Sequence, residues 1–119
     1  MGVHSRRING WAIETAVDGP ITAAAIVEAA EQARVFGGQF QVWVLDASRV
    51  TDFDVSTLPE IQRQTESLRV RGLDRIAIVL PAQARVYVGF IQLSLHDQIH
   101  VFPFDSEAAA LEWIGRGCR

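Results

Sequence analysis

The stretch FQVWVLDASRVTDFDVSTL, residues 40–58, decides the fold. Residues 40–45 are apolar at five of six positions without alternation, as is typical of a strand covered on both faces of a parallel sheet. The rest is rich in small hydroxyls and carboxylates and leads into the start of a helix. In an open α/β sheet, the loops at the carboxyl ends of the strands collect ligands and partners, because backbone donors and helix amino termini point there. We therefore predict a strand over 40–45 that ends in a binding loop over 46–58.

The helix after this loop has a local start signal. Thr57 and Glu60 have the spacing of a capping box, and Pro59 stands in the first turn, where a missing N–H costs nothing. Such a cap contributes about 1 kcal/mol. Apolar residues then repeat at helical spacing as far as Gly72, and a second unbroken apolar run over 76–80 predicts another buried strand.

The amino-terminal third predicts a hairpin followed by a helix. Two alternating segments lie on either side of Asn9 and Gly10, which together are a strong signal for a two-residue turn. Thr22 can cap the helix that follows, and Gly37 and Gly38 mark its end.

The carboxyl-terminal part continues the alternation of helices and strands. We predict a helix over 82–96, and then a strand over 98–102 that Pro103 stops. Asp105 or Ser106 caps the last helix.

These segments predict one α/β domain over residues 1–119, with a mixed β-sheet and the order β-β-α-β-α-β-α-β-α. Segments 40–45 and 76–80 form its buried parallel centre. A chain of 119 residues buries roughly two thirds of its unfolded surface around one core. The mean hydropathy of +0.14 is slightly high for so small a domain and hints at an apolar patch that a partner covers.

Composition excludes several classes of function. A net charge of −3, with the arginines scattered along the chain, argues against nucleic acid as a partner. The single cysteine, Cys118, has no disulfide partner, which fits a reducing cytoplasm. No signal sequence is recognisable, and no apolar stretch reaches the ~18 residues that a membrane span requires. We expect a cytoplasmic protein without a membrane span and without a cofactor.

The element order and the loop resemble the STAS domains. This family comprises the carboxyl-terminal domains of sulfate transporters and the anti-sigma-factor antagonists of bacteria, and its fold is also called SpoIIAA-like. In those domains a strand ends in Asp-x-Ser, a Val follows four residues after that Asp, and a second Asp precedes hydroxyl residues, Gly and Leu at a helix start. The matching positions here are Asp46, Ser48, Val50, Asp54, Ser56 and Leu58. The resemblance implies an α/β, SpoIIAA-like (STAS) fold and a bacterial regulatory module with a protein partner, such as a regulatory kinase or another protein of a sigma-factor pathway.

The loop departs from the family pattern where a phosphorylated antagonist has its acceptor. The residue directly after the second Asp is usually Ser or Thr in those proteins, and here it is Val55. Thr57 replaces the usual Gly, and Pro59 stiffens the turn. Ser56 is a possible phosphoacceptor but is displaced by one residue. We therefore predict a module without a phosphoserine switch.

Polar residues of the loop are our candidate site for a protein partner or an anion. Its three aspartates can each hold a hard cation, but such residues more often cap turns and helices, so we expect no metal site. Neither Ser48 nor Ser56 has a histidine near it in sequence, and no nucleotide-binding or nucleophile-elbow motif occurs, so we expect no catalytic residues and no enzyme. The candidate residues are Asp46, Ser48, Thr51, Asp54, Ser56 and Thr57.

The predicted helix over 82–96 carries apolar residues on two faces, whereas one sheet contact covers only one. We expect Tyr87, Phe90 or Leu93 to be partly exposed and covered by a second copy of the chain in a homodimer. The alternative is a small apolar, lipid-like ligand bound at this helix face.

Overall fold

The computed structural model describes residues 2–37 and 39–119. A five-stranded mixed sheet has the order β1-β2-β3-β4-β5, in which β1 pairs antiparallel with β2 and all the other pairs are parallel. The predicted order of strands and helices is confirmed. The elements are β1 (Gly2–Arg7), β2 (Ala12–Pro20), α1 (Ala23–Gly37), β3 (Val42–Asp52), the 3-10 turn η1 (Val55–Thr57), α2 (Leu58–Arg69), β4 (Arg75–Val79), the 3-10 turn η2 (Ala82–Ala84), α3 (Val86–Leu95), β5 (His100–Phe104) and α4 (Glu107–Gly115).

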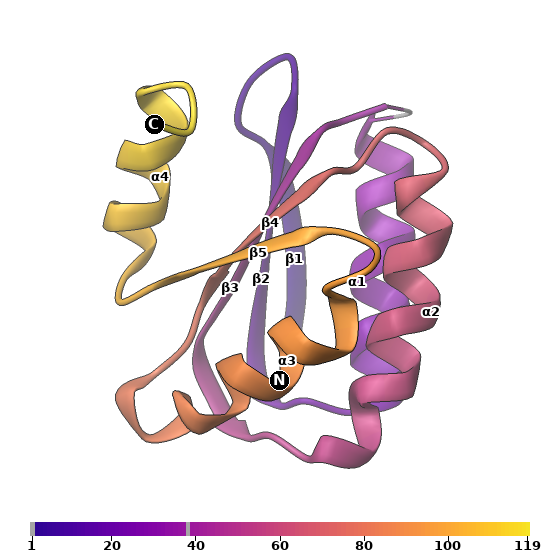
Figure 1. Ribbon diagram of the computed structural model, residues 1–119, viewed down its shortest axis with the longest axis vertical. Helices are drawn as coiled ribbons and strands as arrows, with labels where there is room; N and C mark the ends of the chain where they lie inside the picture. The colour runs from indigo at the N-terminus through magenta and orange to yellow at the C-terminus, as the bar shows by residue number, and fades with distance from the viewer. Residues whose placement is uncertain (1, 38) are drawn as a thin grey trace.

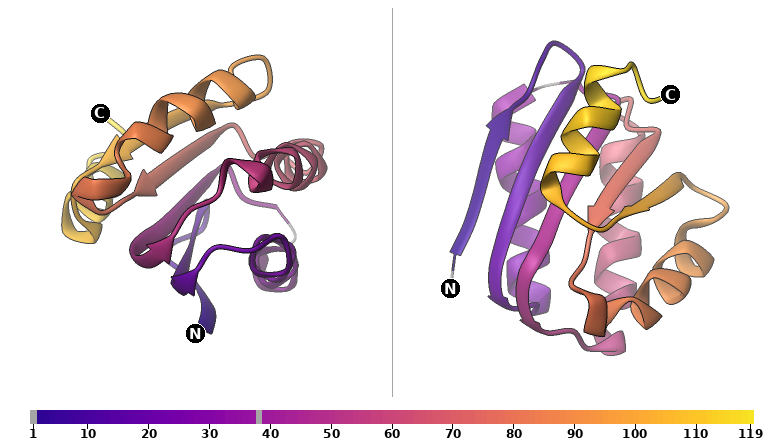
Figure 2. Two further views of the ribbon diagram at one scale, coloured as in Figure 1. Left: turned by 90° about the horizontal axis from the view of Figure 1, so that it is seen from below. Right: turned by 90° about the vertical axis from the view of Figure 1, so that its left-hand side faces the viewer.

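Helices cover the two faces of the sheet unequally. Helices α1, α2 and α3 lie on one face, and α4 lies alone on the other (Figures 1 and 2). The larger core, beneath α1 to α3, includes Trp43, Ile76, Leu68 and Leu95, whereas the smaller core beneath α4 is built around Trp113. This arrangement leaves part of the second face without a covering helix.

The two central strands are those expected from their apolar runs. Strand β3 pairs with β4 in parallel, with Val44 opposite Ala77, and both residues are completely buried. Burial on both faces requires apolar side chains at successive positions, which explains the missing alternation. The predicted parallel centre is confirmed.

A buried hydrogen-bond network crosses the larger core. The indole Nε1 of Trp43 donates to Thr15 Oγ1 over 2.8 Å, and Thr15 Oγ1 also pairs with Ser5 Oγ at 2.7 Å. Thr15 is fully buried, so this network satisfies polar atoms that water cannot reach.

The predicted hairpin turn and the predicted end of the last strand are wrong. The hairpin does not turn on two residues, because the backbone N–H of Ile8 already donates to Ala12 and the connection spans residues 8–11. Pro103 lies inside β5 instead of stopping it, opposite Ile78 of β4. Strand β5 is at the edge of the sheet, where a proline without an N–H interrupts no ladder on its free side. The expected stop of α1 at Gly38 lies outside the described residues.

Within the described part of the chain, no helix has the length and apolarity needed to cross a membrane.

Candidate functional site

Strand β3 takes in much of the stretch that was expected to form the binding loop. It extends over eleven residues to Asp52, and β2 pairs with it along nearly its whole length. The register shifts between Ala16 and Asp18 and again between Gly19 and Pro20, so β3 accommodates extra residues without leaving the sheet. The prediction that the strand ends at residue 45 is therefore wrong.

Asp46 and Ser48 form a local turn at the first of these irregularities. The Oδ1 atom of Asp46 accepts hydrogen bonds from the backbone N–H of Ser48 at 3.1 Å and from its hydroxyl at 2.6 Å. The aspartate thus accepts a hydrogen bond from a backbone N–H two residues further on, as expected of an aspartate in a turn.

The loop proper is the short connection from β3 into η1 and α2. The carboxylate of Asp54 accepts from the backbone N–H of Ser56 at 2.9 Å, as predicted for a capping aspartate. The predicted capping box is wrong, because the hydroxyl of Thr57 donates to the backbone carbonyl of Asp54 at 2.6 Å instead of capping α2. The 3-10 turn η1 replaces the box, and Glu60 pairs with Arg63.

The six candidate residues do not gather in one place. Asp46 lies opposite Ala16 of β2 and Asp52 opposite Pro20, which are four strand steps or about 13 Å apart along β2, and Asp54 lies further on. Ser48, Thr51, Asp54 and Ser56 are exposed, Asp46 is half-buried, and Thr57 is buried with 5% of its surface exposed. The structure therefore separates the pair Asp46 and Ser48 from the turn that contains Asp54, Ser56 and Thr57.

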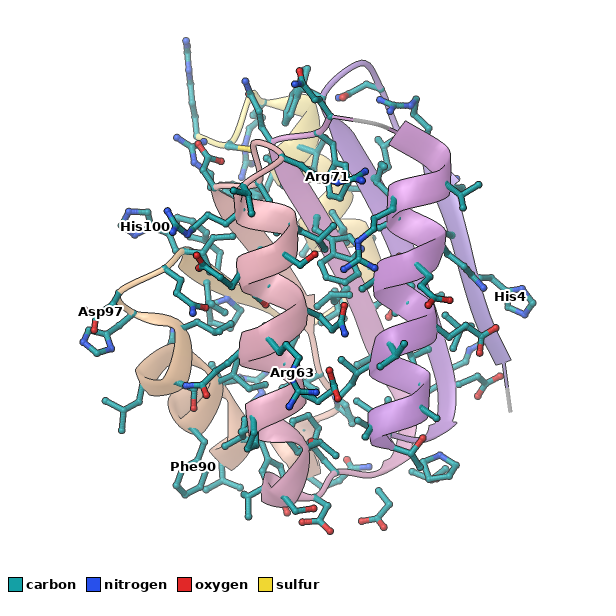
Figure 3. The ribbon with its side chains drawn as sticks, turned by 90° about the vertical axis from the view of Figure 1, so that its right-hand side faces the viewer. His4, Arg63, Arg71, Phe90, Asp97 and His100 are labelled. Carbon is teal, nitrogen blue, oxygen red and sulfur yellow. The ribbon has the colours of Figure 1, made fainter. Side chains whose placement is uncertain are left out.

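Helix α3 lies beside that turn. The ring of Phe53, directly before the turn, stacks at 4.6 Å on Tyr87 of α3, whose ring in turn lies 6.5 Å from that of Phe90. Further along the two helices, Gln62 Nε2 of α2 donates to the carbonyl of Ser94 at 2.9 Å. Figure 3 shows α2 and α3 side by side with Phe90 at the outer side of α3. The aromatic contact joins two regions that the sequence presented as separate candidates.

Large apolar side chains are exposed on this part of the molecule. The expected exposure of Phe90 and Leu93 is found, whereas Tyr87 is half-buried by its ring contacts. Two other large apolar residues are exposed outside this part of the molecule, namely Val35 on α1 and Val70 after α2. We call the following residues the η1–α3 surface: Val55 (48% exposed), Val86 (66%), Phe90 (46%) and Leu93 (70%).

A second polar cluster lies on the other face of the sheet, beneath the start of α4. Arg6 Nε of β1 donates to Glu14 Oε1 of β2 at 2.6 Å, and carboxylate oxygens of Glu14, Asp46 and Glu107 all lie within 4.8 Å of one another. Glu107 is placed there by Ser106, whose hydroxyl accepts from a backbone N–H in the first turn of α4, as predicted for this cap.

The proximity of these carboxylates changes the acidity of Glu107. A hydrogen bond to Glu14, partial desolvation and the negative charges of Glu14 and Asp46 raise the pKa of Glu107 to about 7, and Arg6 opposes this increase. Glu14 is buried, with 3% of its surface exposed, and its Oε2 has no described donor.

Sequence reasoning missed Glu14 and Glu107. The alternation of β2 placed Glu14 between Ala12 and Ala16 on one face of the strand. The sequence did contain a signal for Glu14. A single carboxylate stands between two alanines on one face of a predicted strand, where apolar residues are expected.

Comparisons with known proteins agree with this architecture. No family model and no curated protein matches the chain. Among solved structures, the chain is similar to the unphosphorylated form of the anti-sigma-factor antagonist SpoIIAA, with a TM-score of 0.65 and 14% sequence identity over 98% of this chain and 99% of that one. The similarity thus extends over nearly the whole of both chains, and the chain has the SpoIIAA-like, or STAS, fold.

Proposed function

We propose that this protein is a regulatory module that binds a protein partner through the η1–α3 surface and works without a phosphoserine switch. The observation that carries the proposal is the ring contact between Phe53 and Tyr87, which makes the turn at Asp54 continuous with an apolar, exposed helix face. The likeness to an anti-sigma-factor antagonist supports a regulatory role of this kind.

The η1–α3 surface has the composition of a protein interface. Burial of one large apolar side chain contributes up to about 1.5–3 kcal/mol, so a few such residues at the centre suffice for binding. Polar groups at Asp54 and Ser56 lie at its edge and can supply the hydrogen bonds of a rim.

The turn itself supports the absence of a phosphoserine switch. Val55 occupies the position where the family resemblance implies an acceptor, and it has no hydroxyl. Thr57 is buried and its hydroxyl is bonded to the carbonyl of Asp54. Ser56 is exposed and is thus the one hydroxyl of η1 that a kinase can reach. Incubation with an anti-sigma-factor kinase and ATP should leave the intact mass unchanged, and stoichiometric phosphate on Ser56 or Thr57 would refute this part of the proposal.

We further propose a non-enzymatic role for the whole of residues 1–119 as one domain in the cytoplasm of a bacterium. The free thiol of Cys118 fits a reducing compartment.

A charge placed on the η1–α3 surface tests the proposal. Phe90→Glu should abolish capture of the partner from the native host, because the new carboxylate loses its hydration in the complex. The matched control is Val70→Glu, which puts the same charge on an exposed apolar position at the far end of α2. Mass spectrometry should identify proteins that the unmodified chain and the control retain and that Phe90→Glu loses. A partner retained equally by all three proteins would contradict the proposal.

Self-association through Tyr87, Phe90 and Leu93 stays a prediction that sedimentation can test. A dimer at tens of micromolar that Phe90→Glu converts to a monomer supports a second copy as an occupant of this surface. If the unmodified protein sediments as a monomer, the predicted homodimer is contradicted, and the η1–α3 surface is available to a different protein.

The alternative function, binding of a small apolar ligand, has one observation in its favour. An apolar cavity of about 60 Å³ lies between the sheet and α1, α2 and α3, with Trp43, Ile78 and Ile91 among its lining residues. A cavity of roughly 150 Å³ is needed for one benzene molecule. A lipid-like ligand therefore requires the helices that line the cavity to move away from the sheet, so we place this function second.

A further inference from the structure

Three carboxylates from three different elements meet between the sheet and the start of α4. Glu14 comes from β2, Asp46 from β3 and Glu107 from α4, and an oxygen of each lies within 4.8 Å of the other two. We call these residues the carboxylate cluster. Arg6 is the cation paired with it, through Glu14 Oε1, and 61% of the Arg6 side chain is exposed. When all four groups are ionised, three negative charges face one positive charge, so the cluster has an excess of negative charge.

One oxygen of the cluster is buried without a partner. Only 5% of the Glu14 side-chain surface is exposed, and its Oε2 accepts no hydrogen bond from any described residue. Buried carboxylate oxygens in proteins are normally matched by a donor or a cation. This unmatched oxygen belongs to Glu14, whose carboxylate lies next to those of Asp46 and Glu107. A cation bound between the three carboxylates can therefore supply the missing partner.

We propose that the carboxylate cluster binds a divalent hard cation of the size of Ca²⁺. Its ligand atoms are all carboxylate oxygens, which hard cations prefer, and no thiol or imidazole belongs to the group. Ca²⁺ accepts about six to eight oxygen ligands in a flexible arrangement, whereas Mg²⁺ demands a near-ideal octahedron and keeps several of its waters. Carboxylates that come from three separate elements fit the more tolerant coordination of Ca²⁺ better than that of Mg²⁺. Ser48 supports the site by holding Oδ1 of Asp46.

The cation has a structural consequence that is separate from partner binding. It ties the first turn of α4 to β2 and β3, on the face of the sheet opposite to α1, α2 and α3 (Figure 2). The cluster and the η1–α3 surface therefore lie on opposite faces, and each proposal can fail without the other.

Calcium titration of the full chain tests the site. After dialysis against EDTA and transfer to metal-free buffer at pH 8, calorimetric titration with CaCl₂ should show one saturable site. The melting temperature should rise by about 5 °C or more at a hundredfold excess over the Kd. MgCl₂ should bind at least tenfold more weakly. Asp46→Asn and Glu107→Gln should each weaken calcium binding at least tenfold, because each replaces a charged ligand by a neutral amide of the same shape.

The matched control is Glu112→Gln, which removes the same charge from an exposed position on α4 where the carboxylate pairs with Arg116. It should leave the calcium affinity unchanged. The proposal is overturned if no saturable binding occurs up to about 10 mM CaCl₂, or if all three variants lose affinity equally. Circular dichroism of the variants in EDTA should match that of the unmodified protein, so a loss of binding is not a loss of fold.

Discussion

The pKa of Glu107 predicts a specific dependence of stability on pH. Its value in the folded protein is about 7, compared with 4.5 for an ordinary glutamate. A carboxyl whose pKa is raised by folding stabilises the folded state fully below pH 4.5, and this contribution is lost as the pH rises through 7. A shift of 2.5 pH units at 1.36 kcal/mol per unit sets an upper bound of about 3 kcal/mol. Glu107 is half-buried at a helix start, so solvent screening lowers the expected contribution to about 1 kcal/mol.

Glu107→Gln isolates this contribution. The glutamine amide can donate a hydrogen bond to the Glu14 carboxylate at any pH and thus imitates the protonated acid. In EDTA, urea unfolding at pH 5 and at pH 8 should show that the unmodified protein loses about 1 kcal/mol more than Glu107→Gln between these two values. At pH 8 the variant should be the more stable protein. Equal losses in the two proteins, or a variant that is less stable at pH 8, would refute the assignment of a raised pKa to Glu107.

Two further predictions concern the hydrogen bonds that hold the core and the turn. Thr15→Val should lower the free energy of unfolding in urea by about 1–3 kcal/mol, because the buried N–H of Trp43 loses its acceptor; a change below about 0.5 kcal/mol would contradict the importance of this bond. Asp54→Ala should cost about 1 kcal/mol, measured by thermal unfolding, since the backbone N–H of Ser56 loses its cap. The exposed Asp52 provides the control, because Asp52→Ala should change stability by less than about 0.5 kcal/mol; an equal loss in both variants would argue against the cap.

The central strands and the start of the last helix could be predicted because their signals are local. A strand buried on both faces needs consecutive apolar residues, and residues 40–45 and 76–80 satisfy this need within six residues or fewer. The cap at Ser106 depends on one hydroxyl and a backbone N–H three residues away. Nothing distant in the chain has to be known for either prediction.

The extension of β3 could not be predicted, because it depends on a neighbour. Residues 46–52 contain the polar residues typical of a loop. They stay in the sheet because β2 continues as far as Pro20 and supplies hydrogen-bond partners, while two register irregularities absorb the extra residues. Pro103 is a similar case, since only the edge position of β5 makes a proline acceptable there.

The sequence by itself determined the elements, their order and the burial of the parallel centre. These features could be predicted because hydrophobic periodicity and composition are properties of short stretches of the chain. Only the tertiary structure decided which side chains meet. It joined Phe53 to Tyr87 and so made one surface of two candidates, and it brought Glu14, Asp46 and Glu107 together from β2, β3 and α4. Such contacts depend on the register of the strands and on how a helix packs against the sheet. Both are determined by packing across the whole domain, so a short stretch of sequence cannot predict them.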